Sequence, residues 1–154
     1  MERRSFVYHR SRAPVAADVR RLAVPIIVVS EFPPFDTGRF EGAEFHMSRG
    51  DAQLVVHVAG EDDVTVTFKR VRWHEFTALY NCSSEQVSGS YFKLTEVGSS
   101  PSLARYLAAD KASAKAYKEL HHYRVFLDEH GCHEVFAQSA GIDARSASRP
   151  GAVA

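Results

Sequence analysis

The chain has 154 residues, of which 45% are apolar, 25% charged and 11% aromatic. This length fits one domain, and the aromatic content is typical of a packed chain rather than a disordered one. Lysine and arginine together number 19, as do aspartate and glutamate, so the formal charges cancel. Because dedicated nucleic-acid binders usually carry a strong basic excess, we expect no nucleic-acid partner.

Export and membrane insertion are not indicated. The basic opening, MERRSF, is not followed by the apolar run that a signal peptide needs. Residues 22–29 form the longest apolar stretch, which includes a proline and is far too short to span a membrane. The chain has 2 cysteines and no C-x-x-C pair, which is too few for a disulfide framework. We predict a cytoplasmic protein with reduced cysteines and no membrane partner.

Apolar and alternating patterns predict strands over much of the chain. After an arginine-rich lead-in, residues 25–32 (PIIVVSEF) are typical of a buried strand. Residues 53–59 and 64–68 predict a hairpin closed by the polar turn GEDD. The second of these strands is predicted to continue through a bulge as far as Phe76. Another strand is predicted over residues 90–97.

Helices are predicted after this strand-rich region. Ser100 followed by Pro101 is a strong helix start, and residues 112–120 predict a second helix. Residues 139–154 are small and polar and predict a flexible tail. We therefore predict a single α+β domain over residues 1–138, because strands and helices are segregated rather than alternating. Its core element is a curved antiparallel sheet or partial barrel, with one or two helices before a C-terminal β-hairpin.

The predicted C-terminal hairpin is the stretch 121–137, HHYRVFLDEHGCHEVFA. Residues 129–131 fit a three-residue loop closed by glycine, which places Asp128 opposite Cys132. In this register Arg124 and Glu134 share a face, one diagonal step apart, within reach of a cross-strand ion pair.

Histidine and cysteine side chains raise the question of metal binding or catalysis. Neighbouring histidines on a strand point to opposite faces, so the hairpin brings few zinc ligands together, and we predict no metal and no cofactor. Cys132 with a histidine and a carboxylate has the parts of a cysteine nucleophile, but no helix N-terminus is predicted nearby to activate it. Cys82 is interpreted as structural, and we do not predict an enzyme. The alternative is a half-barrel that binds a small ligand or a metal, with candidate ligands His57, His122, His133 and Glu134.

Across residues 90–138, the sequence LTEV at 94–97, the helix start at Ser100 and the hairpin stretch together resemble the C-terminal half of small uncharacterised bacterial β-rich proteins. Some proteins of this type are thought to be immunity proteins against bacterial toxins. The resemblance implies a non-enzymatic domain that binds a protein partner such as a toxin, and it carries over no catalytic residue. An exposed edge strand also allows a homodimer. The candidate partner-binding residues are Trp73, Tyr91, Arg124 and Phe126.

Overall fold

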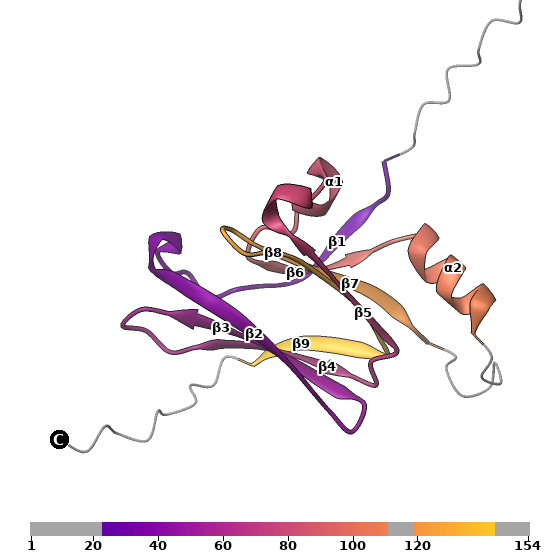
Figure 1. Cartoon of the computed structure of the whole chain (residues 1–154), viewed down its shortest axis with the longest axis horizontal. Coiled ribbons are helices and arrows are strands. Elements are labelled where there is room, and N and C mark those ends of the chain that lie inside the picture. Colours follow the sequence, from indigo (N-terminus) through magenta and orange to yellow (C-terminus); the bar gives the residue numbers. More distant parts are fainter. Residues whose placement is uncertain (1–22, 111–118, 144–154) are drawn as a thin grey trace, which may run out of the picture.

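The structure is a computed structural model that describes residues 23–110 and 119–143. Two antiparallel sheets face each other as the layers of a sandwich (Figure 1). The five-stranded sheet has the order β1 (Ile26–Glu31), β6 (Lys93–Val97), β7 (His121–Leu127), β8 (Gly131–Ala137) and β5 (Trp73–Ala78). The four-stranded sheet has the order β2 (Phe40–Ser48), β3 (Asp51–Val58), β4 (Val64–Lys69) and β9 (Ser139–Asp143).

The antiparallel strand pairing of the predicted α+β domain is confirmed, but the fold is mostly β, and the described strands form two sheets and no closed barrel. The prediction of one long bent strand through residues 64–76 is wrong. Arg70 takes a left-handed φ of 52°, and the chain there leaves β4 for β5 in the other sheet. This crossing converts a curved sheet into two layers.

The hydrophobic core lies between the two sheets. Alternate residues of β3 and β4 are buried while their neighbours are partly or fully exposed, which is the pattern of strands with one solvated face. In the other sheet, β7 and β8 are buried on both faces, because helical segments cover the outer face of this five-stranded sheet (Figure 1). The largest fully buried core side chains are Leu54, Val56, Val66, Phe68, Leu94, Val125, Leu127 and Val135.

Two short helices lie on the outer face of the five-stranded sheet. The predicted start of α2 (Pro101–Ala109) is confirmed, since the Ser100 hydroxyl accepts a hydrogen bond from the Leu103 backbone N–H at 3.0 Å. The first helix, α1 (Ser84–Val87), was not predicted and begins with a reciprocal capping box between Ser83 and Gln86. Two single 3₁₀ turns, η1 (Thr37–Arg39) and η2 (Leu79–Asn81), complete the described elements. The predicted helix at 112–120 and the lead-in before residue 23 lie almost wholly outside the described residues.

The hairpin of β7 and β8 has a different register from the one predicted. Arg124 lies directly opposite Glu134, and Phe126 lies opposite Cys132. The loop is residues 128–130, and Glu129 takes the left-handed conformation, with φ 57°. The register differs by an even number of residues, so every side chain still lies on its predicted face.

The segment predicted as a tail begins with a strand. Ser139–Asp143 form β9, which pairs with β4 from Lys69 to Thr65 and lies at an edge of the four-stranded sheet. Ala140 and Ile142, two residues apart on this strand, both pack against the core. Residues 144–154 lie outside the described part of the chain.

Gly131 is a position where the fold requires glycine. Its φ is +143°, and a Cβ built there would lie 2.2 Å from the Thr77 backbone oxygen. We expect Gly131→Ala to lower the free energy of unfolding by about 1–3 kcal/mol, through backbone strain and the close contact with β5. Gly141→Ala is the matched control, because nothing lies within 4 Å of its Cβ position. Equal urea midpoints for the two variants would contradict this prediction.

Candidate functional site

A buried polar network occupies the outer face of the five-stranded sheet, with Glu134 at its centre. Glu134 Oε1 accepts hydrogen bonds from Arg124 Nη2 at 2.8 Å and Nε at 3.1 Å, and from His122 Nε2 at 3.1 Å. Its other oxygen, Oε2, accepts from the Gln86 side chain of α1 at 3.0 Å. Burial alone would raise the pKa of Glu134, but the hydrogen bonds from His122 and Arg124 outweigh burial and bring the pKa to about 2. The carboxylate is therefore charged, and both of its oxygens accept hydrogen bonds from neighbouring side chains.

The network ties both helices to the sheet. Arg124 Nη1 donates to the Glu85 backbone oxygen in α1 at 2.8 Å. The Ser100 hydroxyl, which caps α2, lies 2.7 Å from His122 Nδ1. Arg124, His122 and Glu134 are each less than 10% exposed. Because every one of these groups has a partner on a covering segment, the network fixes where α1 and α2 lie.

Ser100, His122 and Glu134 form a hydrogen-bonded chain with the residue types of a hydrolase triad. The surroundings do not suit catalysis. The Ser100 oxygen already accepts the Leu103 N–H, and the next residue, Pro101, has no N–H to stabilise an oxyanion. Ser100 is 8% exposed and His122 is 2% exposed, so a substrate does not reach the hydroxyl. The chain is therefore interpreted as a structural part of the network.

Three histidines form a second row, between the sheets near the hairpin loop. His133 Nδ1 lies 3.1 Å from His74 Nε2, and His133 Nε2 lies 2.9 Å from His130 Nε2. The His74 ring stacks on Phe45 with centroids 3.7 Å apart. Burial lowers the pKa of all three, and His133, which both neighbours depress further, has a pKa of about 3. The three imidazoles are therefore neutral at physiological pH.

The residues named as candidate ligands do not converge. His122 and Glu134 meet on the outer face of the five-stranded sheet, whereas His133 lies between the sheets. His57 lies on the open face of the four-stranded sheet, where its Nδ1 is 3.0 Å from Asp63 Oδ2 but has no hydrogen bond. Among the described residues, no three histidine, cysteine, aspartate or glutamate side chains are placed to hold a metal ion.

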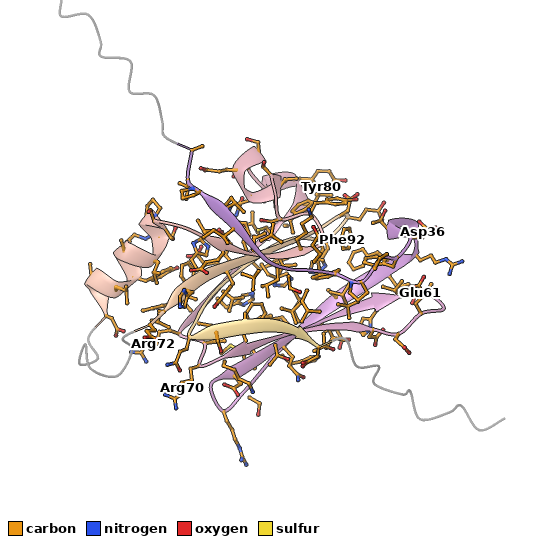
Figure 2. All side chains as sticks on the ribbon, turned by 180° about the vertical axis from the view of Figure 1, so that it is seen from behind. Asp36, Glu61, Arg70, Arg72, Tyr80 and Phe92 are labelled. Atoms are coloured by element: carbon orange, nitrogen blue, oxygen red, sulfur yellow. The ribbon has the colours of Figure 1, made fainter. Side chains whose placement is uncertain are left out.

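A cleft of about 380 Å³ opens beside the turn between β3 and β4. Three of its four carboxylates contact groups of this chain: Glu61 contacts Arg39, Asp63 contacts His57, and Asp143 contacts the Thr67 hydroxyl. Figure 2 shows Glu61 at this end of the molecule, on the same side as Asp36. The cleft is an acidic surface with an apolar wall, lined by Pro33, Phe35, Val58, Glu61, Asp62, Asp63, Val64 and Asp143.

The four predicted partner-binding residues have different surroundings. Arg124 and Phe126 are 7% and 3% exposed, so neither presents a surface to a partner. Trp73 is half-buried and stacks on Tyr106 of α2, with ring centroids 4.8 Å apart. Tyr91 is 40% exposed, and its hydroxyl donates to Asp128 in the hairpin loop at 3.1 Å.

Three exposed aromatic side chains gather around the hairpin loop, and we call Phe76, Tyr80 and Tyr91 the aromatic end. Phe76 is 47% exposed and contacts the His130 ring, with centroids 5.0 Å apart. Tyr80 is 97% exposed and projects from η2 (Figure 2), next to Leu79, whose N–H donates to the His130 backbone oxygen. Phe76 and Tyr80 were not predicted, because their exposure depends on the edge position of β5.

No protein-family model, curated protein or solved structure was found to match this chain. Within residues 23–110 and 119–143, no helix is long and apolar enough to cross a membrane.

Proposed function

We propose that this protein is a non-enzymatic recognition domain that binds another protein through the aromatic end. The observation that carries the proposal is the exposure of Tyr80, at 97%, on a short turn held against the hairpin loop by a backbone hydrogen bond. A rigid aromatic side chain that is largely exposed suits binding, because tyrosine buries much area at small entropic cost and is common among binding hot spots. Phe76 and Tyr91 extend the same surface on either side of the loop.

The most concrete form of the proposal is inhibition of a bacterial toxin in the cytoplasm. Support comes from the resemblance of residues 90–138 to small bacterial proteins, some of which are thought to be immunity proteins. In this mechanism the sandwich is a rigid support, and the aromatic end covers the active site of the toxin. The polar network supports a non-enzymatic role, because its charged groups bind one another and the helices of this chain.

Tyr80→Ala is expected to weaken partner binding at least tenfold, the loss that about 1.4 kcal/mol produces. The protein is used as bait in its own host, and the affinity of the captured partner is measured against purified variants. The matched control is Met47→Ala, because Met47 is 54% exposed on β2, away from the hairpin loop. The thermal midpoint of both variants is expected to equal that of the wild type. Equal affinity of Tyr80→Ala and wild-type protein would remove the aromatic end as the binding surface.

Native mass spectrometry of the untagged protein separates this proposal from the alternative of a ligand-binding protein. A co-purified protein in a fixed ratio supports recognition of a partner. A bound small molecule or metal ion in a fixed ratio supports the alternative and directs attention to the acidic cleft. A bare homodimer identifies a second copy as the partner, and its sensitivity to Tyr80→Ala shows whether the aromatic end forms that contact.

A further inference from the structure

The two cysteines of the chain are distant in sequence but neighbours in the fold. Cys132 lies on β8 directly opposite Thr77 of β5. Cys82 follows η2, and its thiol donates to the Thr77 backbone oxygen at 3.3 Å. The backbone N–H of Cys132 also interacts with the Cys82 thiol. Both cysteines therefore meet at the same residue of the edge strand.

Cys132 lies beneath the covering segment that carries Cys82. Cys132 shares the outer face of β8 with Glu134, because residues two apart on a strand point the same way. Its sulfur lies 4.0 Å from the backbone oxygen of Gln86 in α1. Cys82 immediately precedes Ser83, the N-cap of that helix. A bond between the two sulfurs would join the segment from η2 to α1 to the sheet that it covers.

We propose that Cys82 and Cys132 form an intramolecular disulfide when the protein meets a disulfide oxidant such as oxidised glutathione. The Cys82 thiolate attacks one sulfur of the oxidant and releases one glutathione thiolate. The Cys132 thiolate then attacks the Cys82 sulfur of the mixed disulfide and releases the second. Two electrons pass from the cysteine pair to the oxidant, and the two cysteine protons end on two molecules of glutathione.

Exposure sets the order of these steps and their speed. Cys82 is partly exposed and meets the oxidant first, whereas Cys132 is fully buried and is reached only by the adjacent mixed disulfide. Burial raises the pKa of Cys82, and it raises that of Cys132 to about 12 with a further contribution from the Glu134 charge. Thiolates are scarce at neutral pH, so the bond forms slowly and faster as pH rises. We therefore expect the two cysteines to be reduced under ordinary conditions and to form the disulfide only after sustained exposure to the oxidant.

The disulfide bears on binding through Tyr80, which lies in η2 two positions before Cys82. Fixing this segment would hold the exposed ring in one position and reduce the entropy lost when a partner binds. This consequence rests on the proposed function, whereas the disulfide itself does not. We expect the oxidised protein to bind a partner more tightly than the reduced protein and to show slower amide exchange over residues 79–88.

The test equilibrates the full chain with glutathione redox buffers, then alkylates free thiols and measures intact mass. The native wild type is expected to lose two hydrogens and both alkylation sites while remaining monomeric. The disulfide should form at a glutathione disulfide to thiol ratio at least tenfold lower than in urea-unfolded chain. Cys132→Ala is expected to stop at a glutathione adduct on Cys82, and Cys82→Ser to remain unmodified. A wild type that stops at the adduct, or that oxidises no more readily than the unfolded chain, would overturn the proposal whatever the binding results are.

Discussion

Replacing Glu134 with glutamine is expected to lower the free energy of unfolding by about 3–5 kcal/mol. The change leaves the Arg124 guanidinium, which is 7% exposed, without the carboxylate that lies 2.8 Å away. An unpaired buried charge is costly because the low-dielectric interior does not replace the water that solvated it. Glutamine preserves the size of the side chain, so the loss reports the charge rather than a cavity. Urea unfolding at neutral pH measures it as a shift of midpoint at constant slope.

A double-mutant cycle separates the ion pair from the rest of the network. Arg124→Met removes the cation but leaves Glu134 with donors from His122 and Gln86, so its loss is expected to be smaller. The double variant carries neither charge, and its loss is expected to be less than the sum of the single losses by roughly 1–3 kcal/mol. Additive losses would show that the two side chains contribute independently.

The strands with one solvated face could be predicted from the sequence. In β4 the inward residues Val64, Val66 and Phe68 alternate with threonines, and the structure buries all three. The start of α2 could also be predicted, because Ser100 and Pro101 specify it within one turn. Both features depend on neighbouring residues only, which is why periodicity and capping rules find them.

The arrangement of the sheets was beyond the reach of these rules. The crossing from β4 to β5 depends on a left-handed arginine at position 70, a conformation that residue type does not signal. The hairpin loop was predicted at residues 129–131, whereas it lies at residues 128–130, with Glu129 at φ 57° and Gly131, the first residue of β8, at φ 143°. Direct pairing of Arg124 with Glu134 accompanies the shifted register. The sheet crossing and the hairpin register therefore depend on long-range contacts, which the residue types of the turns do not predict.

The candidate site was predicted only at Tyr91, and the other assignments failed for a related reason. Arg124 and Phe126 lie on the hairpin face that a two-stranded model leaves exposed, but α1 and α2 cover that face (Figure 1). Phe76 and Tyr80 belong to an edge strand and the turn after it, so much of each side chain remains exposed. Whether an aromatic residue is core or surface here depends on which strand forms the edge of the sheet, and that is a property of the topology.

The histidine row predicts that the protein loses stability as pH falls below about 6.5. An unfolded histidine binds a proton near its ordinary pKa of 6.5, whereas folded His133 binds one only at about pH 3, because burial and then its two histidine neighbours disfavour the cation. Between these values the unfolded chain holds more protons, so stability rises with pH across this window. His74 and His130 act in the same direction, since burial lowers the pKa of each. Glu134 adds a loss only below its unfolded pKa of 4.5.

When the pH falls from about 7.5 to about 5, the lowered pKa of His133 alone is expected to reduce the free energy of unfolding by about 2 kcal/mol. Urea midpoints across this range measure the slope, and the ring resonances of His133 in NMR spectra should not titrate until the protein unfolds. His133→Gln keeps a polar side chain between His74 and His130 but cannot take up a proton, so we expect a less stable protein with a flatter pH profile. The NMR titration and the variant test the same cause independently. An unchanged slope in His133→Gln, or a His133 resonance that titrates near pH 6.5 in the folded protein, would show that the buried row is not the source of acid sensitivity.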